Sequence, residues 1–212
     1  FITPLTFEAI SQNQVLHVDT ESWANGNNHI EIAKWAECFV IAPISANTVN
    51  KLANGIADNL LTQTFLASRC PLVLAPSANT YMITNSITQK SLKSLEELGV
   101  HICPAQKKLL ACNDEGTGAM AEVEDIYELT CKQFYKDDFW INKAVVITGG
   151  GSIEKIDDVR CLSNFSSGKM ADALALAFYL KGANVTLITS KTDPNLAKKV
   201  KRIPATSSDD FY

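Results

Sequence analysis

Short, nearly continuous apolar segments alternate along the chain with segments of helical periodicity. Because these apolar segments lack the alternation of a half-exposed strand, we expect strands buried on both faces of a mainly parallel sheet. The predicted strands are 38–42, 72–75, 100–103, 144–148 and 185–189. The predicted helices are 29–36, 46–67, 84–98, 122–135 and 167–181. This alternation indicates an α/β fold with crossover helices.

Two of the predicted helices carry apolar stripes that we expect to face the core. In helix 84–98 the expected stripe consists of Ile87, Leu92, Leu95 and Leu98. In helix 167–181 it consists of Met170, Ala173, Leu174, Ala177 and Phe178. Both predictions rest on residue spacing alone, and the structure can test them.

A second unit is expected to begin near residue 141, where a polar segment is followed by a new strand–loop–helix–strand pattern. We therefore predict a first domain at 1–140 and the first part of a second α/β domain at 141–212. The chain starts with Phe1-Ile-Thr-Pro4, which is typical of the middle of a domain, and it has no initiating Met. We expect a fragment truncated at both ends.

Composition excludes several classes of protein. The 212 residues are 46% hydrophobic and 20% charged, which is typical of a globular chain and excludes disorder. The net charge is −4 and there is no extended basic run, so we expect no nucleic-acid partner. Without a long apolar stretch or a leader segment, we expect a cytoplasmic protein that does not enter a membrane.

The cysteines predict neither a metal site nor a disulfide framework. The six residues are widely spaced, with no C-x-x-C pair and no histidine at metal-ligand spacing. We expect most of them to be small buried apolar side chains. Cys112 is the exception, because it lies in a segment with two glycines among acidic and polar neighbours, which is typical of a mobile flap. Nearby carboxylates would keep its thiol protonated and suited to proton donation.

Polar residues follow the first two predicted strands, at the edge where parallel sheets bind ligands. Ser45, Asn47 and Thr48 follow the first strand, and Ser77 and Asn79 follow the second. Free N–H groups at a helix start favour anions, and an asparagine amide suits substrate positioning. The alternatives are an ordinary polar helix cap and ordinary turn chemistry.

Two further segments are candidates for chemistry. His29 follows Asn28, which is placed to cap helix 29–36, and it is either a surface hydrogen-bonding group or a proton-transfer group. The segment Thr148-Gly149-Gly150-Gly151 follows a strand and is expected to approach a phosphate closely. It matches neither the dinucleotide-binding fingerprint nor the Walker pattern, so the type of phosphate site stays open.

Taken together, His29-Ile, the Ser45-Ala-Asn-Thr stretch, the Pro-x-x-Asn turn at 76–79 and the Cys112 segment resemble the phosphopantothenoylcysteine decarboxylases. These belong to the homo-oligomeric flavin-containing cysteine decarboxylase family, and the resemblance covers residues 1–135. It implies a Rossmann-like, flavodoxin-like flavoprotein domain. Residues 144–190 resemble the opening of the phosphopantothenate–cysteine ligases. The two occur fused in this order in the bifunctional proteins of bacterial coenzyme A biosynthesis.

The first resemblance implies FMN-dependent conversion of 4′-phosphopantothenoylcysteine to 4′-phosphopantetheine. It implies that His29 assists proton removal or substrate positioning, that Asn79 holds the departing carboxylate, and that Cys112 protonates the product. It also implies a trimer with flavin between subunits, and assembly of four trimers into a dodecamer. The residues expected to contact the cofactor are Ser45, Ala46, Asn47, Thr48 and Ser77.

The second resemblance implies ligation of 4′-phosphopantothenate with cysteine, using CTP and Mg²⁺. Its expected substrate or nucleotide residues are Asn164, Arg160, Gly149, Gly150 and Ser166. Two other functions are weighed against this interpretation: decarboxylation of a peptide C-terminal cysteine, and a noncatalytic regulatory subunit. The ligase-like segment argues against the first, and the lack of a long acidic tail argues against the second.

Overall fold

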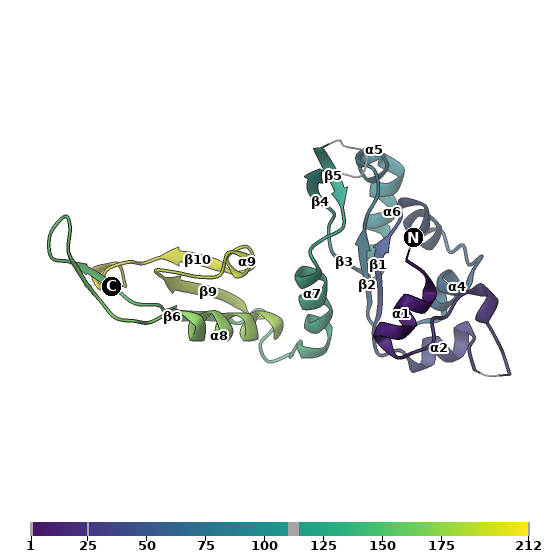
Figure 1. Ribbon diagram of the computed structural model, residues 1–212, viewed down its shortest axis with the longest axis horizontal. Helices are drawn as coiled ribbons and strands as arrows, with labels where there is room; N and C mark the ends of the chain where they lie inside the picture. Colours follow the sequence, from purple (N-terminus) through teal and green to yellow (C-terminus); the bar gives the residue numbers. More distant parts are fainter. Residues whose placement is uncertain (1, 25, 110–114, 212) are drawn as a thin grey trace. The chain divides into compact units, whose positions relative to one another are not determined.

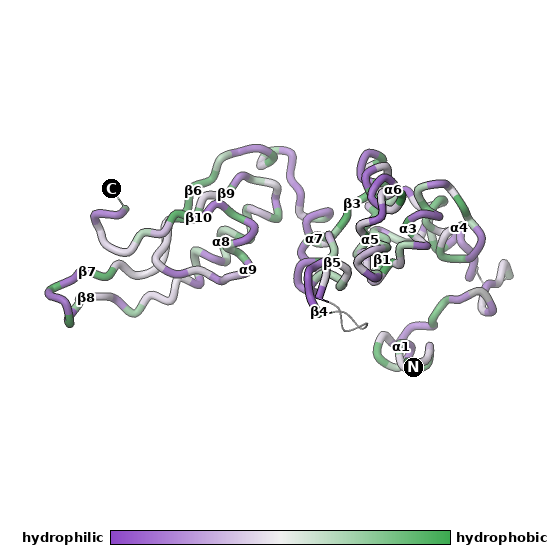
Figure 2. Tube along the Cα trace, turned by 90° about the horizontal axis from the view of Figure 1, so that it is seen from above, coloured by the Kyte–Doolittle hydropathy of each residue, from purple (hydrophilic) through white to green (hydrophobic). Residues whose placement is uncertain are grey.

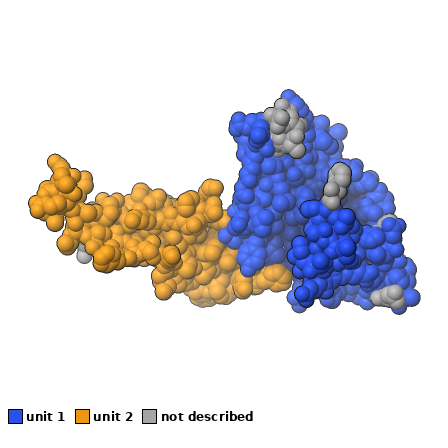
Figure 3. All heavy atoms as spheres, in the orientation of Figure 1, with its two compact units in different colours: residues 1–130 blue, residues 131–212 orange. Residues whose placement is uncertain are grey.

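The computed structural model describes residues 2–24, 26–109 and 115–211. It consists of two compact units, residues 1–130 and 131–212, which Figure 3 shows in different colours. Each unit contains its own parallel sheet, and each is described below by itself. The predicted domain boundary at 140/141 stays a prediction.

Unit 1 is built on a three-stranded parallel sheet in the order β1-β2-β3 (Figure 1). The strands are β1 (Phe39–Ile44), β2 (Leu72–Pro76) and β3 (His101–Ile102). β2 is the central strand, and Val73, Leu74 and Ala75 are fully buried within it. A continuous apolar segment is therefore the pattern to expect of this strand.

The remaining elements of unit 1 connect or flank these strands. The helices are α1 (Pro4–Ser11), α2 (His29–Trp35), α3 (Ala46–Ala53), α4 (Leu60–Ala67), α5 (Thr80–Thr84), α6 (Ser86–Glu97) and α7 (Val123–Tyr135), which continues into unit 2. A 3₁₀ helix spans Val18–Thr20. An antiparallel pair is formed by β4 (Gln106–Leu109) and β5 (Glu115–Ala119).

The core of unit 1 lies between the sheet and helices α3, α4 and α6. It is an apolar cluster of Ile41, Ile44, Val49, Leu52, Phe65, Leu74, Leu95 and Val100. A smaller cluster joins Ala75 and Cys103, from the ends of β2 and β3, to Ala121 and Ile126. The sheet is thus covered with apolar side chains from more than one side, as the uninterrupted strand patterns predict.

The single helix predicted at 46–67 is wrong, because the structure contains two. α3 ends near Asn54, and Gly55 follows with a φ of +68°, which a residue with a side chain rarely adopts. α4 then begins at a capping box: the Asn59 side chain accepts from the Thr62 backbone N–H, and the Thr62 side chain accepts from the Asn59 N–H. This short segment therefore encodes both the end of α3 and the start of α4.

Unit 2 contains a second parallel sheet, in the order β10-β9-β6. Its strands are β6 (Ala144–Gly149), β9 (Asn184–Thr189) and β10 (Lys201–Pro204), of which β10 was not predicted. The other elements are the antiparallel pair β7 (Ile153–Lys155) and β8 (Cys161–Ser163), helices α8 (Lys169–Leu180) and α9 (Pro194–Ala197), and a 3₁₀ helix at Asp209–Phe211. The α/β fold class with mainly parallel sheets is confirmed.

Both predicted helix stripes are partly wrong. In α6, Leu95 is buried and Leu92 is partly buried, but Ile87 and Leu98 are exposed, because the buried face runs through Thr88 and Ser91 instead. Figure 2 accordingly shows much of α6 as hydrophilic. A helix that buries two hydroxyl residues next to leucine cannot be oriented from its apolar positions alone.

In α8 the buried residues are Ala171 and Ala175, with Phe178 partly buried against the core. Met170 and Leu174 are exposed, as are the alanines of the expected stripe. α8 is apolar around most of its circumference, so periodicity does not select a face. Ala171 lies inward because α8 packs closely against Gly149, the last residue of β6.

The corrected face of α6 predicts different effects for two leucines of the same helical segment. Leu95 is 1% exposed and Leu98 is 76% exposed. Leu95→Ala should lower the free energy of unfolding of unit 1 by about 2–5 kcal/mol, because it leaves a cavity in the core. Leu98→Ala should change it by less than about 0.5 kcal/mol. Urea denaturation measures both, and equal effects would contradict the assigned face.

Candidate active site

The ends of β1 and β2 are joined side by side, and this places the two predicted polar segments next to each other. Ile44 is the register partner of Pro76, and the Ser77 backbone N–H donates to the Ile44 carbonyl at 2.9 Å. Ser45 and Ser77 therefore both leave the sheet at its carboxyl edge. This is the edge where open parallel sheets bind ligands.

Ser45 begins α3 as its N-cap. Its Oγ accepts a hydrogen bond from the Thr48 backbone N–H at 3.3 Å and lies 3.1 Å from Thr48 Oγ1. Of the other predicted cofactor residues in this segment, Ala46 is buried and Asn47 is exposed. The helix-cap alternative for Ser45 is thus confirmed as a structural role, and it leaves Ala46 and Asn47 in the first turn of the helix.

The turn after β2 is held by β5. Ser77 Oγ donates to the Gly118 carbonyl at 3.2 Å, and the Ala78 backbone N–H donates to the same carbonyl at 3.0 Å. A Cβ at Gly118 would lie 2.0 Å from the Ala78 carbonyl oxygen, so only glycine allows this approach. Asn79 caps α5, with its Oδ1 accepting from the Tyr81 backbone N–H at 2.9 Å.

A groove of about 540 Å³ lies between the start of α3 and the α5–α6 segment. Its size is within the usual range of small-molecule sites. The groove is lined by Ala46, Asn47, Asn50, Tyr81, Met82, Asn85, Ile87 and Thr88. Two predicted cofactor residues, Ala46 and Asn47, therefore line the same groove as α5, the helix that Asn79 caps.

Several residues lining this groove were missed in the sequence. Tyr81 and Met82 are exposed although both are large and apolar or aromatic, and Asn85 caps α6. Asn50 lies one turn after Ala46 and Asn47, so helical spacing from those residues was the available signal. Tyr81 and Met82 lie just after Asn79, and two large aromatic or apolar side chains that follow a polar turn were a second signal.

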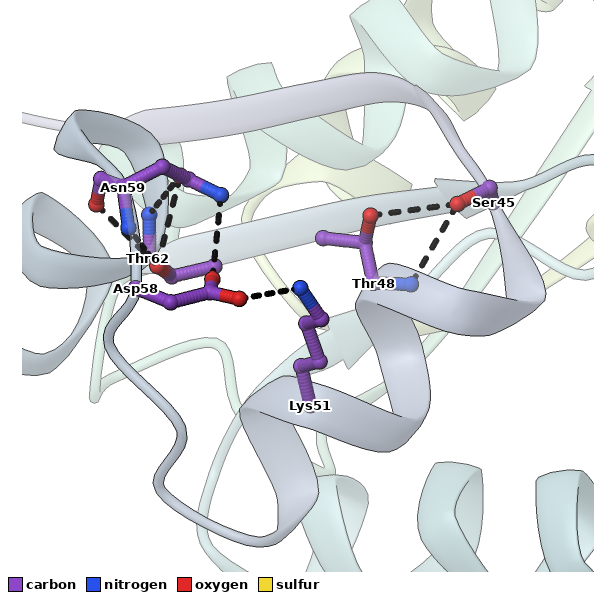
Figure 4. A network of polar contacts seen from close by, with 6 residues as sticks. All are labelled: Ser45, Thr48, Lys51, Asp58, Asn59 and Thr62. Carbon is purple, nitrogen blue, oxygen red and sulfur yellow. Dashed lines mark hydrogen bonds and ion pairs between the residues drawn. The ribbon is translucent and has the colours of Figure 1, made fainter. Parts of the chain in front are cut away.

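α3 and α4 are linked by a polar network (Figure 4). Lys51 forms an ion pair with Asp58, and Asn59 Nδ2 donates to Asp58 Oδ1 at 3.2 Å. The hydrogen bond that the Lys51 ammonium donates to Asp58 holds the pKa of the Asp58 carboxyl below its ordinary value. The network fixes the segment that follows the Ser45 helix, and thereby the position of α3 against α4.

His29 occupies the first turn of α2, as predicted. Asn28 caps the helix, with its Oδ1 accepting from the Ile30 and Glu31 backbone N–H groups at 3.0 and 3.1 Å. His29 Nδ1 lies 3.6 Å from Glu21 Oε1 and has no hydrogen-bond partner among the described residues, and the ring packs edge-on against Trp23. His29 is not among the described residues that line the groove.

Cys112 lies outside the described residues, so its predicted role is not tested. The described residues on either side of it are paired: Leu109 of β4 is the register partner of Glu115 of β5. β5 is in turn bonded to the Asn79 turn through Gly118. The strand pair of β4 and β5 is therefore attached to the candidate site.

In unit 2 the predicted glycine segment leaves the carboxyl end of β6. Gly150 has a φ of +85°, and a Cβ at Gly149 would lie 2.1 Å from the Ala171 Cβ of α8. The Gly151 carbonyl accepts from Ser190 Oγ at 2.9 Å, at the end of β9. The glycines thus allow α8 to approach the sheet edge, which gives them a packing role in addition to any ligand role.

Two of the other unit 2 residues lie beside this segment. A Cβ at Gly151 would lie 2.5 Å from Asn164 Oδ1, and that oxygen accepts from the Ser166 backbone N–H at 2.9 Å. The structure therefore brings Gly151, Asn164 and Ser166 together.

Arg160, by contrast, is bonded within its own turn. Its Nε and Nη2 lie 2.7 and 2.6 Å from Asp157 Oδ2. This pairing holds the pKa of Asp157 below its ordinary value. The predicted nucleotide or substrate role of Arg160 stays a prediction.

Two further properties bear on the class of site. Within the described part of the chain, no helix is both long enough and apolar enough to cross a membrane. Among those same residues, no group of three or more His, Cys, Asp or Glu side chains is arranged to hold a metal ion. Of the five described cysteines only Cys103 is buried, so the expectation that most are buried is wrong.

Two known protein families match successive parts of the chain. Residues 1–135 match the sequence profile of the flavoprotein family. The chain belongs to the flavoprotein family. Residues 140–212 match a second profile, the DNA/pantothenate metabolism flavoprotein C-terminal domain. The predicted flavodoxin-like, Rossmann-type fold is confirmed by this match and by the solved PPC decarboxylase structure described below.

Curated relatives match the whole chain. It is 40% identical to the coenzyme A biosynthesis bifunctional protein CoaBC of Haemophilus influenzae, over 100% of this chain and 53% of that protein. It is 38% identical to the CoaBC of Bacillus subtilis, again over 100% of this chain and 53% of the relative. The chain spans about half the length of the curated relatives it matches.

One solved structure with the same fold is a cysteine-to-serine mutant of PPC decarboxylase complexed with pantothenoylaminoethenethiol. It shares 44% sequence identity with this chain and superposes with a TM-score of 0.51. The match covers 54% of this chain and 66% of that one.

The Lys51–Asp58 pair predicts a pH dependence. A carboxylate whose pKa is lowered on folding stabilises the folded state above its unfolded pKa of about 4, and this contribution is lost as the pH falls through the folded pKa. Lys51→Met should raise the pKa of Asp58 toward its ordinary value, measured by ¹³C NMR titration of the carboxyl group. Lys34→Met, which removes a lysine paired with Glu31, should leave it unchanged. An unaltered Asp58 pKa in Lys51→Met would contradict the assigned cause.

Proposed function

We propose that unit 1 is an FMN-dependent decarboxylase that converts 4′-phosphopantothenoylcysteine to 4′-phosphopantetheine in coenzyme A biosynthesis. The observation that carries this proposal is the groove at the carboxyl edge of the sheet, beside the adjoining Ser45 and Asn79 turns. The flavoprotein match and the CoaBC relatives support the same activity. So does the PPC decarboxylase structure, which holds a pantothenoyl ligand.

The residues at this edge fit a flavin. The groove has the volume of a small-molecule site, and the first turn of α3 offers backbone N–H groups beyond the one that Ser45 accepts. Ser45, Ala46, Asn47, Thr48 and Ser77 are the residues that would hold FMN. FMN, when bound, would accept two electrons from the cysteine part of the substrate and return them after carbon dioxide has left.

The protein's own groups bind, orient and protonate the substrate. Asn79 would hold the departing carboxylate by hydrogen bonds from its amide, and Cys112 would protonate the enethiolate that remains after carbon dioxide has left. His29 would assist proton removal or position the substrate. Because His29 does not line the groove of its own chain, this role is best supported if the site is shared between subunits, as in the trimer that the family resemblance implies.

This division of roles predicts a selective defect in one variant. Cys112→Ser should still release carbon dioxide from 4′-phosphopantothenoylcysteine, whereas formation of 4′-phosphopantetheine should fall by about 100-fold or more, because a general acid is lost. Carbon dioxide release is followed with a carboxyl-labelled substrate, and the product by mass spectrometry. Cys161→Ser, at an exposed cysteine of unit 2, is the matched control and should retain both.

The same assay separates the proposal from its rivals. Equal loss of both products in Cys112→Ser would contradict the role of Cys112. Activity on peptides with a C-terminal cysteine, or on free cysteine, but not on 4′-phosphopantothenoylcysteine would assign a different decarboxylase. Lack of turnover with any of these substrates in protein that binds FMN would favour a noncatalytic regulatory role.

A second candidate function is favoured for unit 2. Residues 140–212 match the pantothenate metabolism domain, and the glycine segment lies with Asn164 and Ser166 at the carboxyl edge of the second sheet. We propose that this unit contributes to CTP- and Mg²⁺-dependent ligation of 4′-phosphopantothenate with cysteine. Gly149 and Gly150 would approach the nucleotide, and Asn164, Ser166 and Arg160 would contact substrate or nucleotide.

The ligase proposal predicts that Asn164→Ala lowers CTP-dependent formation of 4′-phosphopantothenoylcysteine by at least about 10-fold, the effect of losing one good polar contact. Asn184→Ala is the matched control, because Asn184 is an exposed residue at the opposite, amino end of β9. Formation of product is measured by mass spectrometry in the presence and absence of CTP. Equal activity of the two variants would contradict the role of Asn164.

A further inference from the structure

The groove of the candidate active site has no cation for a phosphorylated substrate. Its described lining residues are asparagines, a threonine and apolar or aromatic residues, without a lysine or arginine. A phosphate monoester carries a charge of about −1.5 to −2 at pH 7, and proteins commonly bind it through lysine or arginine side chains. The phosphate of the proposed substrate therefore needs a binding group outside this groove.

A second groove, of about 770 Å³, lies at the same edge of the sheet. It is lined by Lys90 and Lys93 of α6, by Thr117 of β5, and by Pro76 and Ile102, the last residues of β2 and β3. We call it the lysine groove. Because the strands end at its wall, it opens at the carboxyl edge, as the groove of the candidate active site does.

The lysine groove adjoins the Asn79 turn. Thr117 directly precedes Gly118, whose carbonyl accepts from the Ser77 hydroxyl at 3.2 Å. Ile83 of α5, the helix that Asn79 caps, also lines the lysine groove. The two grooves are thus connected through one strand of the hairpin and one short helix.

A further lysine projects from the face of the hairpin that borders the lysine groove. Lys107 of β4 is the register partner of Thr117. Residues directly opposite each other in an antiparallel pair have side chains on the same face, with Cβ atoms about 4.5–5.5 Å apart. Lys108, the next residue, points to the other face and forms an ion pair with Glu122.

Two of these lysines are available to bind an anion. Lys90 and Lys107 form no ion pair with a residue that the structure describes. Lys93, by contrast, lies 3.9 Å from Glu97. Thr117 adds a hydroxyl, which can donate a hydrogen bond to a phosphate oxygen. Two ammonium groups and one hydroxyl therefore meet at this end of the lysine groove.

Two carboxylates lie near this cluster, but neither is paired with Lys90 or Lys107. Glu96 also lines the lysine groove, about 9 Å further along the axis of α6 than Lys90. Glu115 is on the Lys107 face of the hairpin, two residues before Thr117 and opposite a different residue of β4. The positive charge of the lysine groove is thus concentrated at Thr117.

We propose that Lys90, Lys107 and Thr117 bind the phosphate of the decarboxylase substrate, an inference that rests on the proposed function. In that substrate the pantothenoyl arm separates the cysteine carboxylate from the phosphate, so its two ends need separate binding groups. Asn79 would hold the carboxylate end. The apolar side chains of Pro76 and Ile83 would contact the arm between them.

The lysine groove should select phosphorylated over unphosphorylated substrate. Steady-state kinetics with 4′-phosphopantothenoylcysteine and with pantothenoylcysteine measures this preference as a ratio of kcat/KM values. We expect a ratio of about 100 or more in the wild-type chain, because each charged hydrogen bond contributes about 10-fold or more. Lys90→Met and Lys107→Met should each lower the ratio by about 10-fold, through a higher KM for the phosphorylated substrate at unchanged kcat.

Matched variants separate phosphate binding from an effect on folding or on net charge. Lys108→Met removes the same charge one residue from Lys107 but on the other face, and it should keep the wild-type ratio. Lys90→Arg should also keep it. Thr117→Val, which removes only the hydroxyl, should lower the ratio several-fold. In all these variants kcat/KM for pantothenoylcysteine should stay at the wild-type value, which a misfolded variant would not show.

Binding of the products provides a test that needs no turnover. Isothermal titration calorimetry compares 4′-phosphopantetheine with pantetheine, and the phosphate should tighten binding to the wild-type chain but not to the Lys90→Met/Lys107→Met double variant. That result in a chain without decarboxylase activity would contradict the proposed function and still support the phosphate site.

Three results would overturn the phosphate site. The first is a wild-type chain that binds and turns over the phosphorylated and unphosphorylated compounds equally well. The second is a double variant that keeps the wild-type preference. The third is an equal loss of preference in Lys108→Met, which would show an effect of overall charge.

Discussion

The parallel pairing of β1 with β2 is the interaction on which the candidate site depends. It is irregular near its end: Ile41 pairs with Leu74 but Ile44 pairs with Pro76, so β1 has one more residue than β2 over this stretch. Pro43 lies within it and has no N–H to donate to the ladder. The pairing closes again where Ser77 donates to the Ile44 carbonyl, and this contact places the Ser45 and Asn79 turns side by side.

Strands β1, β2, β3, β6 and β9 and the starts of α2 and α3 were predictable because their signals are local. Val73, Leu74 and Ala75 are buried on both faces, so an apolar segment without alternation is what their position requires. Asn28 and Ser45 cap the helices that follow them, and a short polar side chain before an amphipathic segment is typical of a helix start. The polar turns at the carboxyl edge of the sheet follow from these same elements.

Other features depend on contacts that no local pattern contains. Burial of Thr88 and Ser91 shifts the buried face of α6 away from Ile87 and Leu98, and close packing of α8 on Gly149 brings Ala171 inward in place of Met170. The residues of the groove come from α3 and from α5–α6, which are separated by a whole strand in the sequence. His29 could be predicted as a helix-start residue, but not as a residue that lies apart from the groove of its own chain.

Binding of ligand in the groove between α3 and the α5–α6 segment is tested most directly by amide hydrogen exchange, measured with and without FMN and 4′-phosphopantetheine. We expect slower exchange in residues 45–50 and 79–88 when both compounds are present, with no change in the β7–β8 segment at 153–163. Two results would contradict binding in this groove. One is a lack of protection at both 45–50 and 79–88, and the other is protection confined to other residues, such as those of the separate groove that Lys90, Ile102 and Thr117 line.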